Sequence, residues 1–109
     1  MEITPNERDA VYKTIFSRRD VRGQFLPDEI PEDVLMHVLT AAHHAPSVGF
    51  MQPWDFVVVR DIETKQQIKA GFNQAHAESA EMFTDEKQAM YKRLKLEGIV
   101  ESPIGICVT

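Results

Sequence analysis

Apolar positions recur at helical spacing in two stretches of the first half of the chain. Thr4, Pro5 and Glu7 form a helix start in which Thr4 caps and Glu7 completes a capping box. The apolar face that follows is made of Val11, Tyr12, Ile15 and Phe16. This spacing predicts a helix that ends near Ser17 and buries one face. A second stripe, comprising Val34, Leu35, Val38, Leu39 and Ala42, predicts another helix with Pro31 at its first position.

The second half combines short apolar runs with longer helical patterns. The runs at 56–59 and 103–108 are rich in β-branched residues and predict two core strands. Asp61 is expected to cap a third helix, which Gly71 and Asn73 could interrupt. Thr84 can start another helix that continues to Gly98, a natural terminator. Because a core strand closes the sequence, we expect residues 1–109 to be the N-terminal part of one longer domain.

The stretch APSVGFMQPWDFVVV at 45–59 joins the second helix to the first strand. Pro46 disfavours a helical conformation at Ala45, and Gly49 can adopt backbone angles that other residues resist. The loop between them and the strand is apolar and carries little charge. Its composition favours contact with a flat ring system or another subunit, since loops on a rigid scaffold often carry binding groups.

Size and charge restrict the class of protein. A chain of 109 residues holds one modest core, and its formal net charge of −5 argues against nucleic acid as the main partner. Cys107 is the only cysteine, so no disulfide can form within the chain. No apolar run approaches membrane-spanning length, and we expect a cytoplasmic protein. His37, His43 and His44 lack carboxylates at zinc-site spacing, so we expect no metal.

Three arginines lie within five residues of the first helix, at positions 18, 19 and 22. If the segment is extended, Arg18, Asp20 and Arg22 share one face. Guanidinium groups bind phosphate in a bidentate manner, so this cluster could hold one small anion. The alternative is a solvated basic patch paired with nearby acids, and the segment by itself does not exclude it.

Two motifs together resemble the nitroreductase-like flavoproteins. They are SRRDVRGQF at 17–25 and AAHHAPSVGFMQPWDFVVV at 41–59. The chain is more narrowly similar to the 5,6-dimethylbenzimidazole synthase branch, since Asp20 replaces the usual Ser and Phe50 the usual Asn. The sequence KLEGI at 95–99 points the same way. Asp55 departs from this branch, where Arg is usual after the tryptophan.

The resemblance implies an α/β (α+β) fold with helices around a small central sheet, and an FMN-dependent homodimer. It assigns FMN binding to Arg18, Arg19, Asp20, Val21, Arg22, Pro46 and Ser47. Among these, Asp20 is implied to be the catalytic carboxylate, and the loop with Pro46 and Ser47 to lie against the partner's flavin. A nearby guanidinium would favour the negative charge of a reduced flavin.

The expected activity is the oxygen-dependent fragmentation of reduced FMN to 5,6-dimethylbenzimidazole, the lower ligand of cobalamin. Molecular oxygen is the co-substrate, and NAD(P)H is a candidate reductant. Asp20 is the favoured proton acceptor, since breaking an isoalloxazine ring requires protons to leave at defined atoms. Two alternatives stay open: an NAD(P)H-dependent nitroreductase or flavin reductase that keeps its FMN, and a non-catalytic flavin-carrying fragment.

Overall fold

A two-stranded antiparallel sheet lies at the centre of the molecule. The computed structural model describes residues 1–94 and 98–109. Strand β1 (Phe56–Val59) pairs with β2 (Gly105–Val108), so that Phe56 faces Val108 and Val59 faces Gly105. Reciprocal backbone hydrogen bonds of 3.0 Å between Asp55 and Thr109 extend the ladder by one pair. The run of β-branched residues at 56–59 therefore forms the predicted strand.

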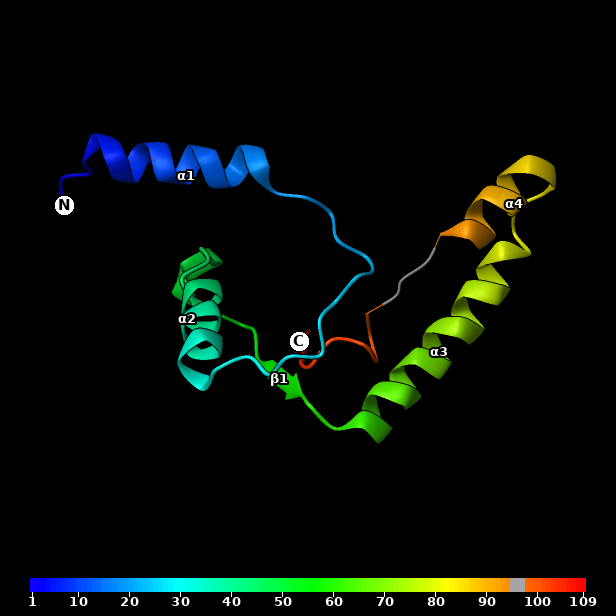
Figure 1. Cartoon of the computed structure of the whole chain (residues 1–109). Helices are drawn as coiled ribbons and strands as arrows, with labels where there is room; N and C mark the ends of the chain where they lie inside the picture. Colours follow the sequence, from blue (N-terminus) through cyan, green and yellow to red (C-terminus); the bar gives the residue numbers. More distant parts are fainter. Residues whose placement is uncertain (95–97) are drawn as a thin grey trace.

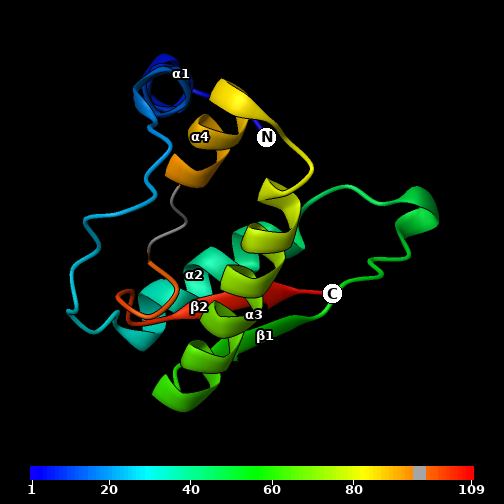
Figure 2. The same cartoon turned by 90° about the vertical axis from the view of Figure 1, so that its right-hand side faces the viewer.

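Helices α2 (Glu32–His43) and α3 (Ile62–Ala80) lie on opposite faces of this sheet (Figures 1 and 2). The Asp61 carboxylate caps α3, because it accepts a 2.7 Å hydrogen bond from the Thr64 N–H, as predicted. Lys65 on α3 is buried, and its Nζ donates a 2.8 Å hydrogen bond to the Ser102 carbonyl. This bond ties α3 to the turn that precedes β2.

Helices α1 (Pro5–Ser17) and α4 (Asp85–Arg93) lie at the periphery (Figure 1). The predicted capping box of α1 is present, with Thr4 and Glu7 exchanging hydrogen bonds, and the helix ends at Ser17. Helix α4 packs against α3, and Gln88 Nε2 donates a 3.0 Å hydrogen bond to the Ala80 carbonyl. The helical hairpin α3–α4 is thus closed near its turn.

Several predicted boundaries were wrong. Pro31 is the cap and not the first residue of α2, because its ψ of 142° is not helical. Gly71 and Asn73 do not interrupt α3, which runs through both to Ala80. Helix α4 ends at Arg93, and β2 begins at Gly105 rather than 103. The predicted helical continuation to Gly98 and most of the KLEGI motif fall on 95–97, outside the described residues.

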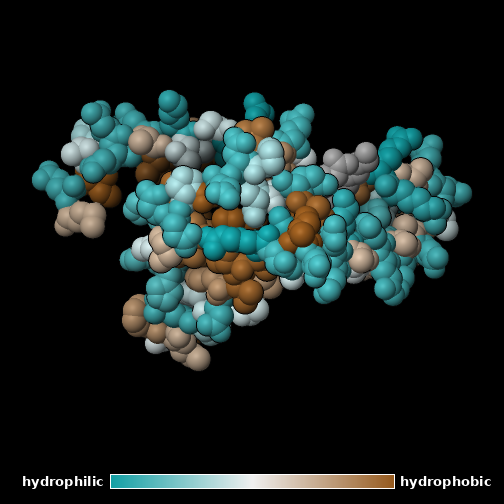
Figure 3. All heavy atoms as spheres, turned by 60° about the horizontal axis from the view of Figure 1, so that its bottom comes forward, coloured by the Kyte–Doolittle hydropathy of each residue, from teal (hydrophilic) through white to brown (hydrophobic). Residues whose placement is uncertain are grey.

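Much apolar surface is exposed to solvent. Among the described residues, Leu35 and Ala80 are the buried apolar ones. The apolar face of α1 is exposed, contrary to the predicted burial, with Phe16 at 79%. Brown, apolar atoms gather in the middle of the face in Figure 3. The radius of gyration is 18.2 Å, whereas a compact domain of this length has about 13 Å. The chain therefore presents apolar surface that a covering partner could bury.

Candidate functional site

The arginine-rich segment begins where α1 ends. Arg18 is the C-cap residue of α1, and its N–H donates a 3.2 Å hydrogen bond to the Thr14 carbonyl. Its ψ of 147° turns the chain out of the helix and into the segment that leads to α2. Arg18 and Arg19 are exposed, and no ion pair of either is found within residues 1–94 and 98–109. Both guanidinium groups are therefore available to an anion.

Asp20 and Arg22 form a two-pronged ion pair. Arg22 Nε and Nη2 lie 2.9 and 2.8 Å from the same carboxylate oxygen, Asp20 Oδ2. This agrees with the prediction that the two side chains share a face. Because both bonds end on Oδ2, the second oxygen Oδ1 keeps its lone pairs free of Arg22. Both side chains are at least half exposed, so the ion pair adds little to the free energy of unfolding. Its main effect is to hold the Asp20 carboxylate in one position.

Two cavities border this segment. One of about 400 Å³ is lined by Asp20, Val21, Arg22, Phe72, His76, Tyr91 and Leu94. Another of about 470 Å³ is lined by Arg19, Asp20, Val21, Arg22, Gly23 and Gln24. The structure thus brings Asp20, Val21 and Arg22 together with the α3–α4 hairpin. A cavity of this size lies within the range of small-molecule sites.

Four rings on the α3–α4 hairpin form an aromatic ladder, which we define as Phe72, His76, Tyr91 and Phe83. The centroids of Phe72 and His76 are 5.3 Å apart. Those of His76 and Tyr91 are 4.9 Å apart with an interplanar angle of 16°. Tyr91 in turn lies 5.0 Å from Phe83. These contacts hold the His76 ring within the ladder, and its first three rings line the 400 Å³ cavity.

Pro46 and Ser47 lie on the loop that follows α2, away from these cavities. Neither is among the described residues that line the two cavities beside Asp20. Ser47 Oγ accepts a 2.9 Å hydrogen bond from the Gln52 N–H. Trp54 Nε1 donates a 3.2 Å hydrogen bond to His43 Nδ1, which ties the end of the loop to α2. Intramolecular bonds therefore fix the loop.

The tip of this loop is apolar and exposed. A short 3₁₀ turn, η1 (Val48–Phe50), contains Gly49 at φ +60°, in the left-handed region that glycine adopts more readily than other residues. Phe50 is 80% exposed and has φ +55°. A bulky ring held outward on a left-handed residue is uncommon and costs free energy. The conformation presents an apolar tip to whatever covers it.

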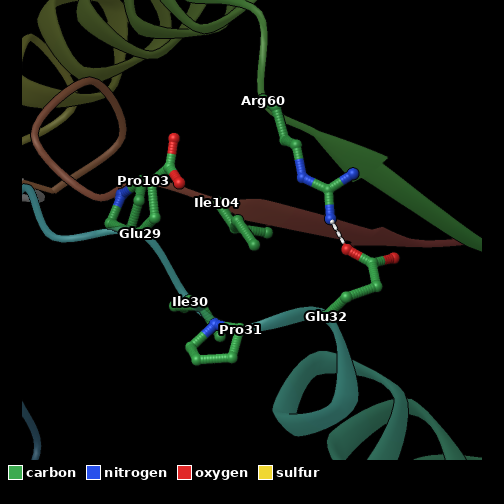
Figure 4. A pocket seen from close by; sticks show the side chains of 7 residues that line it. All are labelled: Glu29, Ile30, Pro31, Glu32, Arg60, Pro103 and Ile104. Atoms are coloured by element: carbon green, nitrogen blue, oxygen red, sulfur yellow. Dashed lines mark hydrogen bonds and ion pairs between the residues drawn. The ribbon is translucent and has the colours of Figure 1, made fainter.

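A cavity larger than the two beside Asp20 lies elsewhere and is lined by none of the predicted site residues. It has about 600 Å³ and lies between the start of α2 and the turn before β2 (Figure 4). Its charged groups include Arg60, which contacts Glu32 at 2.6 Å, and Glu29. The Arg60–Glu32 pair joins the end of β1 to the first turn of α2. We therefore assign this pair a structural role.

Sequence reasoning missed the aromatic wall of the site. Phe72 and His76 are four residues apart, so on a continuous helix they share one face. The expected interruption at Gly71 and Asn73 concealed this spacing. Tyr91 joins them through the α3–α4 turn, a contact between separate helices that no local pattern encodes.

Within the described part of the chain, no group of three or more His, Cys, Asp or Glu side chains could hold a metal ion. No helix in that part is long and apolar enough to cross a membrane.

Comparison with known proteins identifies the family. The family model described as "Nitroreductase family" matches residues 15–109 of this chain. A 5,6-dimethylbenzimidazole synthase of Rhodospirillum rubrum is 39% identical over 95% of this chain and 49% of its own length. That of Rhodobacter capsulatus is 34% identical over 99% of this chain and 52% of its own. The chain therefore spans about half the length of these curated relatives.

A solved structure supports the same fold. Oxidized iodotyrosine deiodinase bound to FMN and 3-iodo-L-tyrosine superposes with a TM-score of 0.76 at 26% identity, over 90% of this chain and 55% of that one. The predicted α/β (α+β) nitroreductase-like fold is thus confirmed. With the family description matching almost the whole sequence, the chain belongs to the nitroreductase family.

Proposed function

We propose that this chain is the N-terminal part of a homodimeric flavoenzyme that converts reduced FMN and oxygen to 5,6-dimethylbenzimidazole. The observation that carries the proposal is the Asp20 carboxylate, fixed by Arg22 on one oxygen and facing a cavity with aromatic walls. The identity of 39% with a protein of that name supports the choice within the family.

The residues present fit FMN. Arg18 and Arg19 offer exposed guanidinium groups, and a phosphate needs such charge-assisted donors. The cavity beside Asp20 combines an ion pair with apolar and aromatic side chains, which suits a flat ring with a polar edge. Pro46 and Ser47 would meet the flavin of the partner subunit, because they lie on a different part of their own chain.

When bound as substrate, reduced FMN supplies both the electrons for oxygen and the carbon skeleton of the product. Asp20 would take up a proton released by the bound ring through Oδ1, the oxygen that Arg22 leaves free. Arg22 fixes the direction of that oxygen, and its positive charge stabilises negative charge on the bound ring. Val21 and Phe72 line the same cavity and would offer apolar surface to the ring.

The test replaces Asp20 by Asn in the FMN-loaded protein. Asn keeps the shape and can hydrogen-bond, but it cannot take up the proton. We expect FMN binding and oxidation of reduced FMN by oxygen to persist, while dimethylbenzimidazole formation falls by about 10²–10⁴-fold. The assay is anaerobic reduction, an oxygen pulse and chromatography of flavin and product.

The matched control is Asp9→Asn, which removes the carboxylate of another exposed ion pair, Arg8–Asp9 at 3.0 Å on α1. It should form product at the wild-type rate. Product formation at that rate in Asp20→Asn would remove Asp20 from the mechanism. Wild type that returns intact FMN and oxidises NAD(P)H steadily would instead be a nitroreductase or flavin reductase. Wild type without any turnover would be a flavin-carrying module.

A further inference from the structure

His76 stands in the aromatic ladder with polar atoms that the proposed mechanism does not use. Its ring is packed between Phe72 and Tyr91, at centroid distances of 5.3 and 4.9 Å. Tyr91 stacks on a face of the ring at an interplanar angle of 16°, and Phe72 is tilted against it at 31°. The nitrogen-bearing edge of His76 is the part that can hydrogen-bond a ligand. No hydrogen bond to either ring nitrogen is seen among the described residues.

The surroundings of His76 explain why such an edge matters. It is half-buried on α3 and lines the 400 Å³ cavity together with Asp20 and Arg22. Among the described residues that line the cavity, the further polar side chain is Tyr91, and the others are apolar. The imidazole nitrogens therefore keep hydrogen-bonding capacity that a ligand in the cavity can use.

We propose that His76 is a further flavin-binding residue, whose imidazole hydrogen-bonds the ring system within the cavity that Asp20 and Arg22 also line. The inference rests on the proposed function, since the ligand class is the one assigned there. A flat heteroaromatic ring carries donors and acceptors on its edges, and it can span two walls that each offer a polar group. His76 thereby selects for the ring of the ligand, whereas Arg18 and Arg19 select for its phosphate.

The experiment measures flavin affinity by fluorescence quenching, with FMN and riboflavin each titrated into the protein. His76→Phe keeps an aromatic ring in the ladder and removes the nitrogens. One hydrogen bond is worth roughly a twofold to tenfold change in affinity. We expect that loss for FMN and riboflavin alike, because they share the ring system. His37→Phe, the same change on α2, should leave both affinities unchanged.

A second variant separates hydrogen bonding from packing. His76→Gln lacks the ring but keeps a donor and an acceptor, so it should bind flavin more tightly than His76→Leu, which keeps neither. The comparison of the Gln and Leu variants tests the same hydrogen bond if His76→Phe does not fold. Wild-type affinity in His76→Phe, or equal affinities of the Gln and Leu variants, would make His76 a packing residue only and overturn the proposal.

The outcomes also separate this inference from the proposed function. If the wild-type protein binds flavin but forms no dimethylbenzimidazole, the proposed reaction falls and the His76 contact is still decided by the titrations. If the wild-type protein forms product and His76→Phe binds flavin normally, the His76 contact alone falls. Absence of flavin binding by the wild-type protein would refute both.

Discussion

Gly98 offers a sharp test of how the arginine-rich segment is held. It is buried and has φ +108°, a conformation that side chains with a Cβ rarely adopt. A Cβ at this position would lie 2.5 Å from Phe25 Cδ2, and closer still to Cε2. Phe25 follows Asp20 and Arg22 by a few residues along the chain. The contact of Gly98 with Phe25 therefore fixes the far end of the segment that carries the site.

Gly98→Ala should destabilise the protein in two ways. The backbone conformation costs about 1–3 kcal/mol for a residue other than glycine. Displacing the Phe25 ring adds about 1–3 kcal/mol, the usual cost of overpacking. With a urea slope of about 1–3 kcal/mol per molar, even the low end lowers the unfolding midpoint by roughly 0.7 M. Flavin affinity should fall as well, because the segment shifts with Phe25.

Gly71→Ala is the matched control. Gly71 lies inside α3, and an added Cβ would meet no atom of the described residues within 4 Å beyond its own helical turn. Alanine there should be neutral or stabilise the helix by about 0.5–1 kcal/mol. Adding Phe25→Ala to the Gly98→Ala protein should recover the part of the loss that comes from the clash, measured against Phe25→Ala by itself. Equal urea midpoints for Gly98→Ala and Gly71→Ala would refute the reasoning.

Three further predictions follow from charge and exposed surface. Arg18→Ala should weaken FMN binding by about 1.5–3 kcal/mol and riboflavin binding much less, because riboflavin has no phosphate; equal losses in fluorescence titrations would contradict the assignment. Hydrogen bonds from its own backbone and from the Gly98 N–H lower the pKa of Glu101 below its ordinary 4.5, so its stabilising contribution is complete above that pH and is lost as pH falls through the lowered pKa. Glu101→Gln should therefore reduce the steepness of acid unfolding below pH 4.5, and an unchanged profile in circular dichroism would contradict this. Finally, the solvent-accessible surface of the chain is 9531 Å², about 3400 Å² more than that of a compact protein of its mass. The chain should therefore associate at micromolar concentration, and a stably folded monomer in sedimentation would count against this.

Local signals in the sequence predicted much of the fold. The capping box at Thr4 and Glu7 and the Asp61 cap both lie within four residues of the backbone groups they satisfy. Strand β1 was predicted to the residue, since the run 56–59 is bounded by Asp55 and Arg60. Such elements are set by short-range chemistry, which a single sequence displays directly.

The site was harder to predict because it joins distant parts of the chain. The arginine cluster and the shared face of Asp20 and Arg22 were predicted from the sequence pattern, and their ion pair follows from that spacing. Their roles toward FMN came from the resemblance. The aromatic wall of the cavity forms because α3 continues through Gly71. A glycine inside a helix weakens it by about 0.5–1 kcal/mol. Packing of α4 against α3 outweighed that local cost. Tertiary contacts therefore decided where His76 lies.

The separation of the two predicted flavin-binding regions leads to a last prediction. In Figure 2 the loop with η1 and the segment after α1 lie on opposite sides of the molecule. If both regions contact one FMN, they must come from two copies of the chain related by the dimer axis. Two variants are needed: Asp20→Asn, and Ser47→Trp, in which the bulky ring blocks the loop. A homodimer of either variant should have two inactive sites. Refolded together in equal amounts, half of the dimers are mixed and each holds one intact site, so about a quarter of wild-type product formation should return. Sites built within one chain would instead leave the mixture as inactive as its components, because every copy carries a defect.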